Sequence, residues 1–216
     1  MPDSFTGDTL TCIRGERVVF SALSFALTDG DALMLRGPNG SGKSSLLRVM
    51  AGLSPAVEGA VRWNGETVTE DITGHHARLI YVGHQNALKP ALTVRENLMF
   101  WAEMHGSGSG VDATLERLGL SALADVPARF LSAGEARRVC LARLGAIEAP
   151  LWLLDEPATA LDSQAQQTVF DLIAEHRARG GMVAMSAHGG PPLPAERTLD
   201  IAAFAVARGA SEDGST

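Results

Sequence analysis

The chain has 216 residues and a formal net charge of −7, and this length allows one large domain with a buried core. The acidic balance argues against a general nucleic-acid-binding protein, because such a protein presents a basic face to the phosphate backbone. The sequence has neither an apolar signal core at its start nor any run of about 18 apolar residues, so we expect a chain that is not exported and does not span a membrane.

The first part of the chain predicts strands that lead into a glycine-rich loop. Residues 9–35 contain short stretches of alternating polarity, which indicate an antiparallel β patch with a turn at Asp29–Gly30. The apolar run Ala32–Leu35 is typical of a buried strand that feeds directly into the loop. Further along, Gly59–Gly65 predicts another strand, closed by an Asn-Gly turn.

Residues Gly37–Ser44 match the pattern G-x-x-x-x-G-K-[ST], which wraps its backbone around nucleotide phosphates. Its glycines allow positive φ and close approach to the ligand, Lys43 reaches the β and γ phosphates, and Ser44 offers a hydroxyl to Mg²⁺. The helix expected over Ser44–Met50 points its positive end at the same phosphates. The alternative is a glycine-rich surface turn. The ATP-binding residues predicted here are Gly37, Pro38, Asn39, Gly40, Ser41, Gly42, Lys43, Ser44 and Ser45.

Helices are predicted for residues 86–146, after a strand over Arg78–Gly83 that ends at His84–Gln85. Two helix starts carry a capping-box pattern, in which a hydroxyl and an acid three residues later satisfy each other's backbone N–H groups. The second of these helices is expected to run to Ile147. The two patterns are Thr93 with Glu96 and Ser132 with Glu135.

A buried strand that ends in two acids is predicted next. The run Pro150–Leu154 is wholly apolar and is followed by Asp155 and Glu156. Active sites of open α/β sheets lie at the carboxyl ends of their strands, so these acids are candidate functional residues. A helix over Asp162–Arg179 and a strand over Met182–Ser186 are expected after them.

Six motifs occur together and in order, and the set resembles that of the ATP-binding cassette family. The resemblance implies an α/β fold: a P-loop NTPase (RecA-like) core with an antiparallel β subdomain and an inserted helical subdomain. It implies a single ATP-binding domain over residues 1–208, made of the β subdomain and P-loop core (1–85), the helical subdomain with the signature (86–146) and the remaining core (147–208), before a disordered tail (209–216). The motifs are the phosphate loop, Gln85, Leu131–Glu135, Leu151–Glu156, Ala160–Asp162 and His188.

The family pattern implies catalytic roles for the matching residues. Asp155 would hold Mg²⁺ together with Ser44, and Gln85 would touch the metal or the water and sense the membrane partner. Glu156 would act as the general base on the attacking water, and His188 would contact the γ-phosphate. The alternatives are a solvated strand-end acid for Glu156 and a structural histidine for His188.

The resemblance also implies a dimer. Two copies would face each other head to tail, so that each ATP lies between the phosphate loop of one copy and the Ser132 loop of the other. The start of the Ser132 helix would supply the missing anion contacts. One chain would then form half of each site. The residues expected to contact ATP from the second copy are Ser132, Ala133, Gly134 and Glu135, and Asp162 is also expected at the ATP site.

The sequence departs from the family pattern in two places. The signature is usually L-S-G-G-Q, and here Ala133 and Glu135 replace a glycine and the glutamine, so that Glu135 brings a negative charge near the nucleotide. The aromatic residue that usually stacks on adenine is replaced by Arg14, whose guanidinium plane can also stack on a base. The alternative for Arg14 is a solvated arginine at a strand end.

The segment Tyr81–Leu98 and the Leu-Ser-Ala-Gly signature are similar to the ATPases of the cytochrome c maturation system. This similarity implies a peripheral protein on the cytoplasmic face of the bacterial inner membrane that powers haem export, or the release of a haem-loaded periplasmic chaperone. Cys12 and Cys140 lie far apart without C-x-x-C spacing, which fits a reduced cytoplasmic setting. The alternatives are the ATPase of another compact transporter and a soluble cassette ATPase acting on DNA or ribosomes.

The expected partners are a second copy of the chain and integral membrane subunits of a haem-handling complex, without nucleic acid. Direct contact with haem is not expected, because the chain lacks C-x-x-C-H and the pair His75–His76 is expected in a polar surface turn. A coupling helix of the membrane subunit is expected on the segment after Gln85, unless that segment serves the core or is ordinary surface. The residues expected to form its shallow apolar groove are Ala87, Leu88, Ala91 and Leu92, with Lys89 at the rim.

Overall fold

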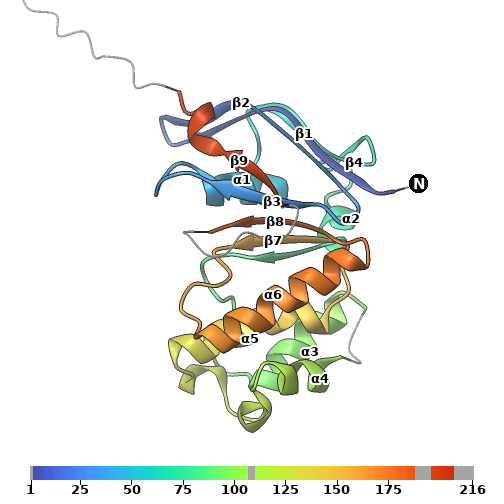
Figure 1. Cartoon of the computed structure of the whole chain (residues 1–216), viewed down its shortest axis with the longest axis vertical. Helices are drawn as coiled ribbons and strands as arrows, with labels where there is room; N and C mark the ends of the chain where they lie inside the picture. The colour runs from blue at the N-terminus through green and yellow to red at the C-terminus, as the bar shows by residue number, and fades with distance from the viewer. Residues whose placement is uncertain (1, 107–109, 188–195, 207–216) are drawn as a thin grey trace, which may run out of the picture.

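The computed structural model describes residues 2–106, 110–187 and 196–206 of the chain. Figure 1 shows an antiparallel sheet at the top, a parallel sheet across the middle and most of the helices below. This arrangement confirms the α/β fold expected from the sequence, with a P-loop core and a separate antiparallel sheet. The predicted tail at 209–216 lies outside the described residues.

The antiparallel sheet has the strand order β2-β1-β4-β5. Its first two strands pair from Ser4 with Thr28 to Arg14 with Arg17, so they are much longer than the short strands expected within residues 9–35. Register shifts interrupt the pairing, and such bulges break the alternation of polarity that the sequence would otherwise show. The strands are β1 (Ser4–Arg14), β2 (Arg17–Thr28), β4 (Glu58–Trp63) and β5 (Glu66–Thr67).

The predicted Asn-Gly turn joins β4 to β5. Asn64 and Gly65 have φ angles of 51° and 87°, and this pair of positive angles is typical of a type I′ hairpin turn. The prediction of a tight hairpin at this position is therefore confirmed.

The second sheet is parallel throughout, with the strand order β6-β7-β8-β3-β9. Every residue of β7 and β8 is buried, as expected for central strands covered on both faces. The strand β9 was not predicted, because its sequence is polar and lacks the apolar run of a buried strand. It lies at the edge of the described sheet, where it pairs with β3 alone. The strands are β3 (Ala32–Arg36), β6 (Leu79–Val82), β7 (Leu151–Asp155), β8 (Met182–Ser186) and β9 (Glu196–Asp200).

Six α-helices occur in the described residues. Helix α1 packs between the two sheets, whereas Figure 1 shows α3 to α6 on the other side of the parallel sheet. Both predicted capping boxes are present, at the starts of α3 and α5. The helices are α1 (Lys43–Met50), α2 (Ile72–Ala77), α3 (Val94–Met104), α4 (Val111–Arg117), α5 (Ala133–Ala146) and α6 (Ser163–Ala178), with 3₁₀ turns η1 (Ser121–Leu123), η2 (Ala128–Phe130) and η3 (Ile201–Phe204).

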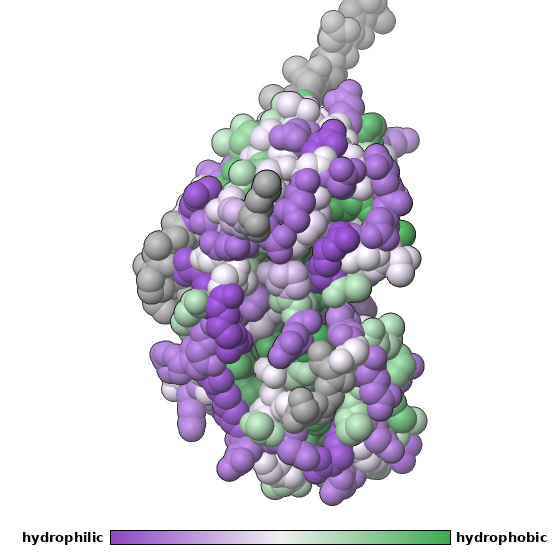
Figure 2. Space-filling view, turned by 90° about the vertical axis from the view of Figure 1, so that its right-hand side faces the viewer, coloured by the Kyte–Doolittle hydropathy of each residue, from purple (hydrophilic) through white to green (hydrophobic). Residues whose placement is uncertain are grey.

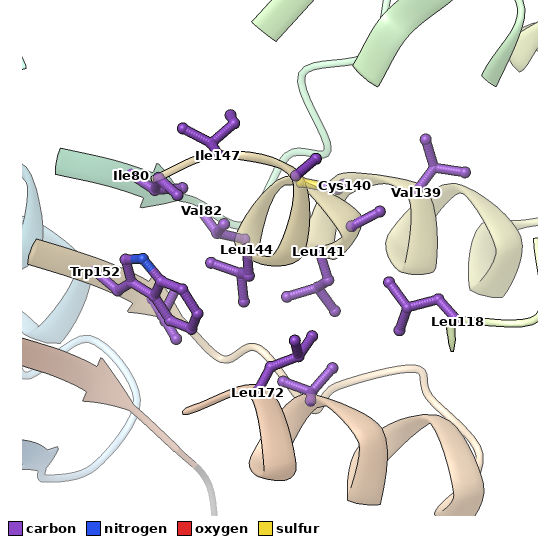
Figure 3. Packing of buried hydrophobic residues seen from close by; sticks show 14 of the residues in the cluster. Ile80, Val82, Leu118, Val139, Cys140, Leu141, Leu144, Ile147, Trp152 and Leu172 are labelled. Atoms are coloured by element: carbon purple, nitrogen blue, oxygen red, sulfur yellow. The ribbon is translucent and has the colours of Figure 1, made fainter. Parts of the chain in front are cut away.

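Hydrophobic cores cover both faces of the parallel sheet. One core fills the space between the two sheets and surrounds α1. The other lies between the parallel sheet and α3 to α6, and Figure 3 shows Trp152 of β7 with Leu141 of α5 and Leu172 of α6 in this core. Burial of apolar area on both faces fixes the strand ends from which the functional loops emerge.

The segment around His75 forms a short helix, α2. The prediction of a polar surface turn at this position is therefore wrong. His75 is 0% exposed, its Nε2 lies 2.8 Å from the carbonyl oxygen of Met50, and its ring stacks on that of Phe5. Burial lowers the pKa of His75, which favours the neutral ring. His76 is exposed, but its Nε2 lies 3.1 Å from the carbonyl oxygen of Ala51.

The face of the molecule in Figure 2 is hollowed between the half that contains the sheets and the helical half, and hydrophobic side chains are exposed beside the hollow. Within the described residues, no helix combines the length and the apolar character needed to cross a membrane.

Candidate functional site

The loop between β3 and α1 bends sharply at the carboxyl end of the parallel sheet. Gly37, Gly40 and Gly42 have φ angles of 137°, 76° and 107°, a region that glycine adopts readily. A Cβ atom on Gly42 would lie 2.4 Å from Cγ1 of Val19, so only glycine lets the loop pack this closely against β2. The predicted residues Pro38, Asn39 and Gly40 are exposed at the outside of the loop.

The side chain of Lys43 folds back into this loop. It is 6% exposed, and its Nζ donates to the carbonyl oxygens of Gly37 at 2.7 Å and Pro38 at 3.1 Å. The buried Oγ of Ser41 has no hydrogen-bond partner in the described part of the chain, and no described side chain caps the start of α1. The loop therefore combines a cation with uncapped backbone N–H groups, and this combination binds anions.

The two acids after β7 share a contact with Ser186 of β8. Asp155 is 4% exposed, and its Oδ1 accepts a hydrogen bond from Oγ of Ser186 at 2.7 Å. The same hydroxyl accepts the backbone N–H of Glu156 at 3.0 Å. The Glu156 side chain leaves the strand in a different direction, since its carboxylate accepts from Oγ1 of Thr159 at 3.3 Å. The acids are thus adjacent in sequence but sit in different surroundings.

A buried arginine that the sequence did not reveal lies behind this pair. Arg137 of α5 donates to the carbonyl oxygens of Gly83, Asp155 and Glu156, each at 2.9 Å. Its pattern, Ala-Arg-Arg-Val after the signature, does not show which arginine turns inward, so no local signal could have found it.

A cleft of about 810 Å³ opens beside the phosphate loop. Ser44, Gln85 and Asp155, the three residues expected to hold a metal, all line this cleft, so the fold brings them together from α1, the segment after β6 and β7. The lining also includes Trp101 and Met104 of α3. The signature residues are not part of its lining.

The segment after Gln85, on which a shallow apolar groove for a coupling helix was expected, contributes little to the cleft. Of the four residues of the expected groove only Ala87 lines the cleft, while Leu88 packs against the helical core. Lys89 places its ammonium 4.3 Å from the ring centre of Phe100, a cation–π contact at the surface of α3.

Asn97 of α3 holds this segment in place. Its side chain is 1% exposed and accepts the N–H of Lys89 at 2.8 Å. Its amide group donates to the carbonyl oxygens of Lys89, Leu92 and Thr93 at 2.9 to 3.1 Å. One buried amide thus contacts four backbone groups between Lys89 and Thr93, where the chain passes from β6 to α3 without forming a helix or strand.

The signature motif lies at the exposed start of α5. Oε2 of Glu135 accepts the N–H of Ser132 at 2.8 Å and its Oγ–H at 2.7 Å, and Oγ of Ser132 accepts the N–H of Glu135 at 3.3 Å. The hydrogen bonds from the Ser132 hydroxyl and N–H lower the pKa of Glu135, so the carboxylate form is favoured. Ala133 and Gly134 form the first turn of this helix.

The remaining predicted residues lie elsewhere. Asp162 caps α6, because its Oδ1 accepts the N–H of Ala165 at 2.8 Å. Arg14 is exposed at the end of β1, and its Nη2 donates to Oγ of Ser54 at 2.9 Å. His188 lies outside the described residues.

Known proteins resemble the chain in sequence and in fold. The family model described as ABC transporter matches residues 20–159. A relative from Paramagnetospirillum magneticum, the cytochrome c biogenesis ATP-binding export protein CcmA, is 53% identical over 96% of this chain and 98% of its own. The proteins of the same name from Rhodospirillum rubrum and Haemophilus influenzae are 51% and 41% identical, over 94% and 90% of this chain and 88% and 93% of theirs.

Solved structures support the same fold. An ABC transporter ATP-binding protein from Pyrococcus furiosus superposes with a TM-score of 0.81 over 94% of this chain and 100% of its own, at 20% identity. An ATP-binding subunit of another ABC transporter gives a TM-score of 0.79 over 85% of this chain and 79% of its own, at 23% identity. Identities at this level show the fold alone. Together with the sequence matches, they confirm the family expected from the six motifs: the chain belongs to the ABC transporter family and, within it, to the family of the cytochrome c biogenesis ATP-binding export protein.

Proposed function

We propose that the chain is the ATP-hydrolysing subunit of a membrane complex for cytochrome c maturation, where it drives haem export or the release of a haem-loaded periplasmic chaperone. The observation that carries this proposal is the cleft in which Ser44, Gln85 and Asp155 meet beside the phosphate loop. The choice of complex is supported by relatives whose name states cytochrome c biogenesis and export, and which align with nearly the whole chain.

The phosphate loop fits a nucleoside triphosphate. Lys43 is held by carbonyl oxygens of its own loop, and Ser41 keeps a buried hydroxyl that no described group satisfies. Phosphate oxygens would give both side chains stronger, charge-assisted partners. Ser44, Gln85 and Asp155 offer the oxygen ligands that Mg²⁺ prefers, and they are proposed to hold that ion. The chemistry that bound Mg²⁺ supplies is neutralisation of charge on the transferring phosphoryl group.

Glu156 is proposed to act as the general base of hydrolysis. The oxygen of a water molecule attacks the γ-phosphorus, the bond to the β–γ bridging oxygen breaks, and the water proton moves to the Glu156 carboxylate, which yields ADP and phosphate. The neighbouring Asp155 is committed to Ser186 within the strand end, so the two acids can take separate roles. His188 is proposed, from the family pattern, to contact the γ-phosphate.

A second copy is proposed to complete each site. The start of α5 is exposed at Ser132 and Ala133, where backbone N–H groups and the helix dipole favour a phosphate. Gly134, Glu135 and Asp162 are proposed to contact the same nucleotide. Each ATP would then be held between two chains, so that hydrolysis depends on dimer formation.

The cleft is also the proposed docking site for a helix of an integral membrane subunit. Its walls include the apolar side chains of Leu53, Trp101 and Met104, and Met104 is 64% exposed. Arg48 and Arg143 supply positive charge, while Asp155 is the one acid among the described residues that line it. An amphipathic helix with an acidic side chain fits these walls, and it would hold the chain at the cytoplasmic face of the inner membrane as a peripheral subunit.

We do not propose that the chain contacts haem or nucleic acid directly. The Nε2 atoms of His75 and His76 face the carbonyl oxygens of Met50 and Ala51, so these histidines are committed within the fold. A net charge of −7 also disfavours a nucleic-acid partner.

The test has a biochemical arm and a cellular arm. The purified chain should hydrolyse ATP only with Mg²⁺ present, and it should co-purify from membranes with integral membrane subunits. Deletion of its gene should stop formation of c-type cytochromes, and the wild-type gene should restore it. Hydrolysis and membrane association without any effect on c-type cytochromes would instead favour the ATPase of another compact transporter. Absence of ATP hydrolysis in the assembled complex would reject the proposal as a whole.

A further inference from the structure

Glu156 has an unusual backbone conformation for a residue with a side chain. Its φ of 48° lies in the left-handed region that favours glycine. Non-glycine residues stay in this region only where the surrounding structure holds them, and such residues cluster at functional sites. On one side the holding group is Ser186, since the backbone N–H of Glu156 donates to its O at 3.2 Å and its Oγ at 3.0 Å.

Arg137 holds the other side of this residue. Its Nη2 donates to the carbonyl oxygens of Glu156 and Asp155, and its Nη1 donates to that of Gly83, each at 2.9 Å. The side chain is buried, with 6% of Arg137 exposed. Both backbone polar groups of Glu156 are therefore fixed, the N–H by β8 and the C=O by α5.

A guanidinium suits this arrangement better than any other side chain. It presents five N–H donors in a planar fork, so a single group can reach the carbonyl oxygens at the ends of two neighbouring strands. A lysine ammonium is a compact point with three donors and does not span the same acceptors. Loss of the fork would remove a charged donor from three carbonyl oxygens and leave that of Glu156 with the N–H of Thr159 at 3.2 Å, so the Asp155–Glu156 peptide would be held less firmly.

Arg137 also lies on the helix that begins with the signature. Ser132 caps α5 and Arg137 follows on its second turn, so both move with the same rigid helix. We propose that Arg137 is a positioning residue: it fixes the direction of the Glu156 side chain and links it to the helix start that contacts the nucleotide of the second copy. This inference rests on the proposed function, because it needs the general-base role of Glu156.

The experiment is a double-mutant cycle in the full-length protein, purified in complex with its membrane subunits. Arg137→Lys should lower kcat ~10- to 100-fold, the size expected when a catalytic group is misplaced, while the Kd for ATP changes less than about 3-fold. In a Glu156→Gln background, where the base is already absent, the same substitution should change the single-turnover rate by less than about 2-fold. If Arg137 merely stabilised the fold, Arg137→Lys would lower the rate by the same factor in both backgrounds.

Arg138→Lys is the matched control. Arg138 is the next residue on α5, and its Nη1 points to the carbonyl oxygen of Leu118 at 3.5 Å, away from the acid pair. The Arg138→Lys substitution should leave kcat unchanged. Thermal unfolding checks that each variant is folded, and Arg137→Gln takes the place of Arg137→Lys if the lysine variant is unfolded, with the same pattern expected.

The outcomes separate this inference from the proposed function. An equal loss of rate in both backgrounds, or an unchanged kcat in folded Arg137→Lys and Arg137→Gln, would overturn the positioning role. If the wild-type protein hydrolyses ATP and Glu156→Gln abolishes it, the proposed function stands whatever Arg137 does. If the wild-type complex does not hydrolyse ATP, the proposed function itself fails.

Discussion

The hydroxyl of Ser132 donates a hydrogen bond to Oε2 of Glu135 over 2.7 Å, and the backbone N–H of Ser132 donates to the same oxygen over 2.8 Å. The protein's own carboxylate thus occupies groups at a helix N-terminus that would otherwise be available to a phosphate. The capping box of α3 provides a comparison, because Glu96 also accepts the N–H of Thr93 at 2.8 Å but lies far from the signature in sequence.

Removing the charge of Glu135 should therefore strengthen ATP-driven dimerisation. We expect Glu135→Gln to raise the dimer association constant about 5-fold, because a negative charge no longer faces the nucleotide at the helix start. Sedimentation with ATP in a Glu156→Gln background measures this without hydrolysis. Glu96→Gln is the control for loss of an acid from a capping box and should have no effect. An unchanged association constant in Glu135→Gln would mean that its side chain lies outside the site.

Replacing the proposed base should separate catalysis from binding. Glu156→Gln is expected to lower kcat ~10²- to 10⁴-fold, the usual contribution of a general base, because glutamine cannot take the proton from water. The side chain stays nearly the same size, so the affinity for ATP should remain close to that of the wild type. Phosphate release and equilibrium ATP binding measure the two quantities. Rapid hydrolysis by this variant would contradict the assignment.

Arg14 is expected to contribute to binding of the adenine base of ATP and not to binding of its phosphates. The guanidinium is anchored to Ser54, so it offers a fixed plane at the end of β1. We expect Arg14→Ala to weaken ATP binding roughly 5-fold or more, as for loss of a stacking partner, and to leave binding of inorganic triphosphate unchanged. Competition binding with both ligands measures the difference. Equal affinities for ATP in the two proteins would identify Arg14 as an ordinary solvated arginine.

A charge placed in the cleft should prevent attachment to the membrane. Met104 is 64% exposed and lines the cleft, whereas Met99 on the same helix is 39% exposed and does not line it. We expect Met104→Asp to lose most membrane recruitment while it keeps ATP binding, since a carboxylate cannot be buried against an apolar helix face at low cost. Met99→Asp should remain membrane-bound. Flotation of membranes from cells that express each variant makes the comparison, and normal recruitment of Met104→Asp would exclude the cleft as the docking site.

The buried pair Trp152 and His176 should make stability depend on pH. Their rings stack with centres 3.8 Å apart, and burial lowers the pKa of His176 to about 4. The unfolded chain takes up a proton near pH 6.5 and the folded chain only near pH 4, so the neutral ring contributes its full stability above pH 6.5 and that contribution falls as the pH drops through this window.

The loss of stability that protonation of His176 causes should be measurable by urea unfolding. Between pH 7.5 and pH 5 the free energy of unfolding should fall by about 2 kcal/mol on account of His176. Because His75 is also buried with a lowered pKa, the comparison needs His176→Phe, in which the pH dependence should be smaller by this amount. An identical pH dependence in both proteins would show that His176 does not titrate between the two states in this range.

Local sequence predicted those elements whose structure depends on near neighbours. The capping boxes at Thr93 and Ser132, the Asn64–Gly65 turn and the wholly apolar strand before Asp155 were all confirmed, because each is fixed by residues within a few positions of one another. The family resemblance implied that Ser44, Gln85 and Asp155 would lie together. The parallel sheet explains why they line one cleft, since its strand ends meet at one edge.

The features that were missed depend on contacts between distant residues. Nothing near His75 in the sequence shows that its ring packs on Phe5, about 70 positions away, so a short helix with one buried histidine was taken for a polar turn. Arg137 is indistinguishable from its neighbour Arg138 until the ends of β6 and β7 are placed beside it. The polar edge strand β9 gains its structure only from pairing with β3.

The four hydrogen bonds of Asn97 tie the connection that follows Gln85 to α3. The same connection is also held by the packing of Leu88 on the helical core and by the N–H of Ala128, which donates to the carbonyl oxygen of Leu92 at 2.9 Å. We therefore expect a displacement of this connection at the cleft to reach α3 as a movement of the helix, because little free backbone lies between them.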